Sequence, residues 1–214
     1  MKVCCVGYRP WALDIYESIK DNDYEVLIIS SKKEYDEEKI IEYDPDYILF
    51  YGWSWIINSK LLEDFKCVML HPSPLPKYRG GSPIQNQIIN GEIDSAVTLF
   101  LMDSGIDTGD ILAQEYLSLE GSLSDIFDRI TKIGKKLTLD VLTNNYTLRK
   151  QDNENSSYFS RRKPSQSEIT IDEIMTKSGE YLHNKIRMLQ EPYPSSFIKT
   201  SDGRKLKIVL SELE

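Results

Sequence analysis

Two loops carry the residues in this sequence that are best suited to chemistry. The first, residues 70–81 (LHPSPLPKYRGG), contains His71 with three prolines and two glycines, which is typical of a rigid, extended loop. The second, residues 103–109 (DSGIDTG), contains Asp107. A neutral imidazole accepts a proton or donates a hydrogen bond according to its tautomer, which a neighbouring carboxylate can fix. Such a pair suits acyl transfer to an amine, in which the amine loses a proton and an oxyanion is stabilised.

Each loop also has a plain structural interpretation. A single histidine beside a turn is usually solvated or structural. The stretch DSGIDTGD alone could be a tight turn rich in helix-capping residues. Only the two loops together favour catalysis over these alternatives.

The elements that must position these loops alternate between strand and helix patterns. Strands are predicted at residues 2–7, 25–30, 47–51, 67–71, 95–102 and 109–116, and helices at 10–19, 34–43, 58–65, 83–89 and 123–142. This order predicts an α/β, Rossmann-like fold with a mainly parallel sheet and helices on both faces. Ligands bind beyond the carboxyl ends of the strands in such sheets, where we expect both loops to lie.

The sequence divides into a core and a C-terminal extension. Residues 1–150 form the predicted catalytic core, and residues 151–214 the extension. Residues 144–167 are polar and are interpreted as a linker or surface excursion, followed by a helix at 179–189. Strands at 196–199 and 206–210 form a predicted hairpin that turns at Asp202-Gly203. We expect this extension to pack on the core or on a partner chain, or to contact the substrate.

Composition narrows the classes of partner. The net charge of −8 and the pI of about 5 disfavour a nucleic-acid partner. The sequence has neither an apolar run of about 18 residues nor a signal-peptide cleavage site, so we expect a cytoplasmic protein without a membrane partner. Three cysteines and two histidines without metal-ligand spacing predict that no metal is bound.

Two longer motifs resemble one known family. Residues 71–92 (HPSPLPKYRGGSPIQNQIINGE) and 96–114 (AVTLFLMDSGIDTGDILAQ) are similar to the formyltransferases that use N10-formyltetrahydrofolate. That family includes methionyl-tRNA formyltransferase, glycinamide ribonucleotide transformylase and the sugar N-formyltransferases. The separation of His71 and Asp107, 107 − 71 = 36 residues, matches the family spacing. The resemblance implies that His71 binds the formyl oxygen or helps to remove the amine proton, and that Asp107 orients His71 and a proton-carrying water.

The resemblance also implies binding residues. The folate pocket would be lined by the loop after the fifth predicted strand and by a turn after the third, at Met102, Asp103, Ile106, Trp53, Trp55 and Ile56. Ordinary packing is an equal alternative for the two tryptophans. Substrate contacts are expected at Arg9, Trp11, Ser73, Lys77, Arg79 and Tyr158. For the charged residues in this set, a solvated surface position is the alternative.

One position departs from the family pattern. Met69 occupies the place of an asparagine that lies two residues before the family histidine. Methionine has no hydrogen-bond donor, and the loss of one donor to an oxyanion commonly costs ~3 kcal/mol. A backbone amide, Ser54, Asn86 or a bound water could replace it. The departure also leaves open a non-catalytic protein that binds folate and a nucleotide sugar.

The C-terminal part bears on which amine is the acceptor. Residues 158–164 (YFSRRKP), 168–171 and 184–197 resemble sugar N-formyltransferases, which formylate the 4-amino group of a nucleotide-linked 4-amino-4,6-dideoxy sugar and are usually homodimers. The preferred acceptor is UDP-4-amino-4,6-dideoxy-N-acetyl-L-altrosamine of the pseudaminic acid pathway, followed by dTDP-4-amino-4,6-dideoxyglucose. Glycinamide ribonucleotide and methionyl-tRNA rank lower, the latter because the chain has 214 residues and is acidic.

Overall fold

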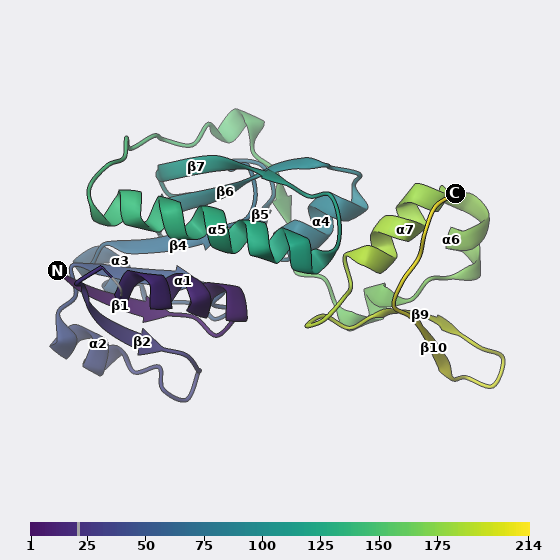
Figure 1. Ribbon diagram of the computed structural model, residues 1–214, viewed down its shortest axis with the longest axis horizontal. Coiled ribbons are helices and arrows are strands. Elements are labelled where there is room, and N and C mark those ends of the chain that lie inside the picture. The colour runs from purple at the N-terminus through teal and green to yellow at the C-terminus, as the bar shows by residue number, and fades with distance from the viewer. Residues whose placement is uncertain (21) are drawn as a thin grey trace.

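The computed structural model describes residues 1–20 and 22–214, and its centre is a six-stranded sheet (Figure 1). The strand order is β2-β1-β3-β4-β6-β7. Four strands run parallel, namely β1 (Lys2–Val6), β2 (Glu25–Ile29), β3 (Tyr47–Tyr51) and β4 (Cys67–His71). Two further strands, β6 (Asp94–Leu101) and β7 (Ile111–Ser118), complete the sheet. Strand β6 is antiparallel to both of its neighbours, so β7 runs in the same direction as β4. The predicted α/β fold with a mainly parallel sheet is confirmed.

Helices cover both faces of the sheet. On one face α1 (Pro10–Lys20) and α5 (Leu123–Leu142) pack against each other and against the larger buried cluster (Figure 1). On the other face, α2 (Glu37–Tyr43) and α3 (Ser59–Asp64) bury Ile40 and Leu61. Alternate residues of each inner strand point to opposite faces, so strands buried on both faces read as continuous apolar runs.

Local capping explains where two of the helices begin. The Asp36 side chain accepts hydrogen bonds from the backbone N–H groups of Glu38 and Lys39, so α2 begins at Glu37 rather than at the predicted residue 34. Ser122 and Asp125 form a reciprocal capping box at the start of α5, whose predicted bounds agree with the structure.

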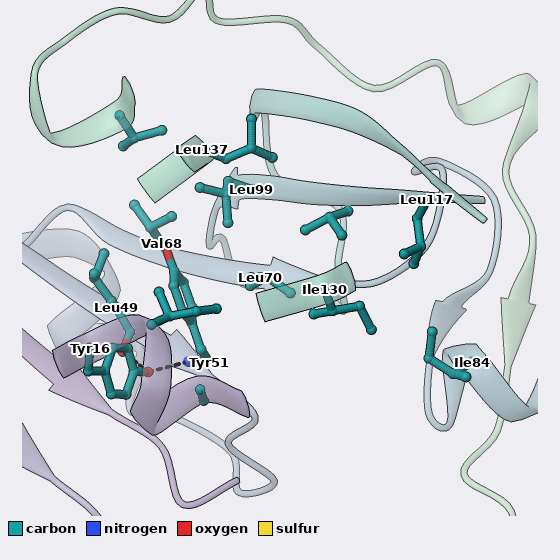
Figure 2. Close-up of a cluster of buried hydrophobic side chains, with 14 of the residues drawn as sticks. Tyr16, Leu49, Tyr51, Val68, Leu70, Ile84, Leu99, Leu117, Ile130 and Leu137 are labelled. Atoms are coloured by element: carbon teal, nitrogen blue, oxygen red, sulfur yellow. Dashed lines mark hydrogen bonds between the residues drawn. The ribbon is translucent and has the colours of Figure 1, made fainter. Parts of the chain in front are cut away.

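Tyr16 ties α1 to the sheet beneath it (Figure 2). Its buried hydroxyl lies 3.0 Å from both Val6 O and Leu49 O, and it accepts a hydrogen bond of 2.8 Å from Tyr51 N. A phenylalanine would leave this backbone N–H buried without an acceptor. We expect Tyr16→Phe to lower the free energy of unfolding by about 1–3 kcal/mol in urea denaturation.

The matched control is Tyr116→Phe. Tyr116 lies on β7 with most of its side chain exposed, and its hydroxyl bonds Asp94 Oδ1 at 2.7 Å. Water can replace that bond, so we expect a change below about 0.5 kcal/mol. Equal effects from the two variants would contradict the role given to the Tyr16 hydroxyl.

The extension contains α6 (Ile171–Thr176), α7 (Gly179–Arg187) and a hairpin of β9 (Ser196–Lys199) and β10 (Lys205–Ile208). It contacts the core through α7, which packs on α4 (Pro83–Ile89) (Figure 1). Several large apolar side chains on it are exposed, among them Ile171, Met175 and Val209. The homodimer stays a prediction. No helix among the described residues is long and apolar enough to cross a membrane.

The segment interpreted as a linker has a definite place in the fold. After α5 it forms two 3-10 turns (Asn153–Asn155 and Pro164–Ser167) and the short strand β8 (Tyr158–Phe159), which pairs in parallel with β5 (Arg79–Gly80). A glycine pair makes this approach possible. A Cβ on Gly80 would lie 2.3 Å from Phe159 O, and one on Gly81 would lie 2.4 Å from Arg161 Cα. The YRGG sequence therefore allows β8 and the residues after it to pack closely against residues 79–81.

Candidate active site

A cavity of about 580 Å³ lies beyond the carboxyl ends of β1, β3 and β4. Both residues of the predicted catalytic pair line it, and so do seven of the predicted binding residues: Arg9, Trp11, Trp53, Trp55, Ile56, Ile106 and Tyr158. A second cavity of about 590 Å³, between α7 and the chain end, contains neither His71 nor Asp107. The first cavity is therefore the candidate active site.

The structure brings the imidazole of His71 to the carboxylate of Asp107. His71 is the last residue of β4 and is 5% exposed. Its Nε2 lies 2.8 Å from Tyr78 O, and its Nδ1 lies 3.5 Å from Asp107 Oδ2. A backbone carbonyl only accepts hydrogen bonds, so Nε2 carries a proton. In the neutral ring Nδ1 is therefore the nitrogen that can accept a proton, and the carboxylate facing it stabilises the resulting cation.

The route by which Asp107 reaches His71 differs from the expectation. We expected both loops to lie beyond the carboxyl ends of parallel strands, but β6 runs antiparallel to β4. Leu101, at the end of β6, therefore pairs with Val68, near the start of β4. The loop after β6 must fold back toward His71. This position of the loop is stabilised by Gly80 N, which donates a 2.7 Å hydrogen bond to Asp107 Oδ2.

Aromatic residues form one wall of the cavity. The rings of Trp53 and Trp55 lie 4.6 Å apart between centroids, and Tyr8 packs 5.3 Å from Trp55. Trp53 is buried and belongs largely to the core, whereas Trp55 is 42% exposed. The buried indole Nε1 of Trp53 has no hydrogen-bond partner among the described residues. This wall offers a flat, apolar surface.

Five predicted binding residues do not line the cavity. Met102 packs against the apolar cluster under the loop, and Asp103 accepts bonds from Gly105 N and Thr108 Oγ1 within its own loop. Ser73 is fully buried and donates to Lys77 O, and Lys77 itself is exposed. Arg79 is buried in internal hydrogen bonds. Nothing in their placement supports direct ligand contact.

Cationic residues that the sequence analysis did not select form another part of the wall. Arg161 and Arg162 follow β8 and line the cavity together with Arg9. None of the three forms an ion pair with a carboxylate of the described residues. Burial lowers the pKa of the Arg162 guanidinium, which remains a cation at neutral pH. The motif YFSRRKP contains both arginines, but only the pairing of β8 with β5 brings their side chains to the cavity.

The structure also bears on the position of Met69. Met69 lines the cavity and packs against Leu75 and Phe100.

Two of the proposed replacements for the family asparagine already form hydrogen bonds within the protein. Ser54 Oγ bonds Tyr8 OH at 2.8 Å, and Asn86 Nδ2 donates to Gly81 O at 2.8 Å. Gln85, another lining residue that sequence reasoning missed, has a buried Nε2 without a partner in the described chain.

No cysteine offers a nucleophile. All three thiols are buried, and burial raises the pKa of Cys4 and of Cys67 to about 12. A thiol with such a pKa is protonated at neutral pH and inert. The described residues hold no cluster of three metal-ligating side chains. Among the side chains that line the cavity, His71 and Asp107 form an imidazole–carboxylate pair.

Fold and site together define an α/β protein with a cavity at the carboxyl ends of its parallel strands and an imidazole–carboxylate pair in the wall of that cavity. Residues 6–142 match the family model described as formyl transferase. The chain belongs to the formyl transferase family.

Curated relatives match most of the length of this chain. It is 32% identical over 198 residues to a methionyl-tRNA formyltransferase of Sulfurimonas denitrificans, covering 89% of this chain and 63% of that protein. A relative of the same name from Orientia tsutsugamushi is 32% identical and is covered over 60% of its length. The chain thus spans about three fifths of these curated relatives.

Solved structures resemble the whole described fold. A methionyl-tRNA formyltransferase from Clostridium thermocellum superposes with a TM-score of 0.86 at 35% identity, covering 97% of both chains. A 4-N formyltransferase from Francisella tularensis has a TM-score of 0.80 at 24% identity, covering all of this chain and 98% of that one. The latter likeness is one of fold.

Proposed function

We propose that the protein transfers a formyl group from N10-formyltetrahydrofolate to the 4-amino group of a nucleotide-linked 4-amino-4,6-dideoxy sugar. The observation that carries the transfer chemistry is the contact between His71 Nδ1 and Asp107 Oδ2, 3.5 Å apart in the wall of a cavity. Membership of the formyl transferase family supports the same reaction class.

The reaction requires one proton to move from the acceptor amine to the leaving nitrogen, and this pair can carry it. The bound folate supplies an electrophilic formyl carbon, and its N10 is the leaving nitrogen. As the acceptor amine forms its bond to that carbon, His71 Nδ1 accepts the proton that the amine loses. Asp107 stabilises the imidazolium, and His71 then returns the proton to the leaving nitrogen. Protons balance without a metal or a covalent intermediate.

The aromatic wall fits a folate ring. Trp53 and Trp55 supply flat apolar surface. A fused heteroaromatic ring stacks on such apolar faces. Ile56, which is 98% exposed at the rim, gains a covering surface when such a ring binds.

The cationic wall supports an acceptor that carries phosphate. Arg9, Arg161 and Arg162 line the same cavity as the catalytic pair. Guanidinium groups bind phosphate oxygens through paired hydrogen bonds. A nucleoside diphosphate link between base and sugar provides this anionic group. The UDP-linked altrosamine derivative and the dTDP-linked glucose derivative are the two forms to compare.

Methionyl-tRNA is the second candidate acceptor, because the relatives at 32% identity carry that name. The chain length of 214 residues does not argue against it, since a solved structure of that name is matched over 97% of its own chain. The net charge of −8 does disfavour binding a polyphosphate backbone. We therefore rank the sugar first.

The deciding experiment is a product assay by mass spectrometry. The protein is incubated with N10-formyltetrahydrofolate and, separately, with both nucleotide sugars, glycinamide ribonucleotide and methionyl-tRNA. We expect a gain of one formyl group on a nucleotide sugar. Formylation of methionyl-tRNA alone would replace the acceptor, and folate binding without any product would favour the non-catalytic alternative.

The family departure at Met69 gives a separate prediction. Met69→Asn places a hydrogen-bond donor in the cavity wall where the oxyanion develops. We expect the variant to raise kcat by about tenfold, a part of the ~3 kcal/mol commonly attributed to one such donor. Met69→Leu, which restores no donor, should not raise it. A fall in kcat for Met69→Asn at unchanged thermal midpoint would mean that another group, such as Gln85, already fills this role.

A further inference from the structure

Gln151 connects the loop of the catalytic carboxylate to the rest of the protein. Its side chain uses both edges of the amide. Nε2 donates to Asp107 O at 2.9 Å and to Gly109 O at 2.7 Å. Oε1 accepts from Arg79 Nε at 3.1 Å and from Arg79 Nη2 at 2.8 Å. Both amide protons and the amide oxygen are therefore engaged.

The arginine behind this amide is itself held in place. Arg79 is 7% exposed, and Nη2 also donates to Asn153 Oδ1 at 2.9 Å. Arg79 pairs with no carboxylate in the described chain. A buried cation without a carboxylate requires well-placed hydrogen-bond acceptors, and amide oxygens supply them. A glutamate at position 151 would suit Arg79 better, yet it has no protons for the two carbonyls of the loop.

Asp107 needs such support because its backbone is in the left-handed region, with φ of 54°. A non-glycine residue persists there only when its surroundings fix it. Gly80 follows Arg79 in the chain, and its backbone N–H donates to the Asp107 carboxylate at 2.7 Å. Gln151 donates to the backbone carbonyl of Asp107. Two adjacent residues of β5 thus hold both ends of Asp107, one directly and the other through Gln151.

We infer that Gln151, oriented by Arg79, is a positioning residue that keeps the Asp107 carboxylate directed at His71. Neither Gln151 nor Arg79 lines the cavity, so neither touches a ligand. Their effect reaches the reaction through the conformation of one loop. The inference rests on the proposed function, because it gives the contacts of Gln151 and Arg79 a role in formyl transfer.

The test is Gln151→Glu, which keeps side-chain size and the acceptor for Arg79 but removes both donors to the loop. A carboxylate facing the carbonyls of Asp107 and Gly109 repels them. We expect kcat to fall by roughly 30-fold or more, with KM for both substrates within about threefold. The variant should remain folded because the pairing with Arg79 is retained, and kcat is compared at a temperature well below its thermal midpoint. The matched control is Gln190→Glu, at a side chain that lines the second cavity and accepts from Leu123 N at 3.0 Å, and it should leave kcat within about threefold.

A spectroscopic readout separates positioning from general damage and needs no turnover. The chain has two histidines, and His183 bonds Ser211 Oγ away from the candidate active site. In side-chain ¹⁵N spectra, Gln151→Glu should shift the His71 Nδ1 resonance and leave both His183 resonances in place. Wild-type kcat and an unchanged His71 signal in Gln151→Glu would overturn the inference. Absence of any formylated product with the wild-type protein would instead overturn the proposed function. The His71 signal would then still test whether Gln151 positions the Asp107 carboxylate.

Discussion

Replacing His71 with alanine is expected to abolish formyl transfer, lowering kcat by about a thousandfold or more. His71 Nδ1 is the nitrogen placed to accept the amine proton, because Nε2 is committed to Tyr78 O at 2.8 Å. Initial rates with saturating folate and acceptor measure the effect directly.

The control for this variant is His183→Ala, which removes the other histidine of the chain. His183 lines the second cavity and bonds Ser211 Oγ at 2.9 Å. We expect wild-type kcat for it. Circular dichroism and folate binding should show that His71→Ala is folded. If folded His71→Ala retains more than about a tenth of wild-type kcat, His71 is not the proton acceptor.

Asp107→Asn is expected to cost about two to three orders of magnitude in kcat with little change in the affinity for either ligand. The substitution preserves shape, keeps an oxygen for Gly80 N, and tolerates the left-handed backbone that Asp107 adopts. It removes the charge that stabilises the His71 imidazolium across 3.5 Å. Single-turnover rates, compared with dissociation constants from calorimetry, separate chemistry from binding.

Asp103→Asn is the matched control in the same loop. The Asp103 carboxylate accepts bonds from Gly105 N and Thr108 Oγ1 and does not line the cavity. We expect at most a severalfold change in kcat. If the two aspartate variants lose activity equally, the integrity of the loop, and not the charge of Asp107, is what the reaction needs.

Most elements of the core could be predicted because local patterns determine them. The strands β1, β3 and β4 read as short apolar runs, since both of their faces are buried. The bounds of α5 follow from the Ser122–Asp125 capping box and the apolar stripe behind it. The antiparallel direction of β6 was not predicted, because strand direction depends on the connection across the sheet and not on residue pattern.

The binding residues were predicted less well for a related reason. Ser73 and Arg79 lie in the same motif as His71, and their types suit ligand binding, yet both side chains are turned into the protein. Motif position does not specify the direction of a side chain. Conversely, Arg161 lies 90 residues after His71 (161 − 71 = 90) and reaches the cavity only because β8 pairs with β5.

The sequence by itself determined the α/β class, the family and the pairing of His71 with Asp107, because these depend on short motifs and on their spacing. Tertiary structure decided how the pair is held. Nε2 of His71 is committed to Tyr78 O, and Gln151 supports Asp107 from 44 residues away. Such contacts join segments that are distant in the chain, and their hydrogen-bond geometry exists only once the strands and the returning segment have packed together.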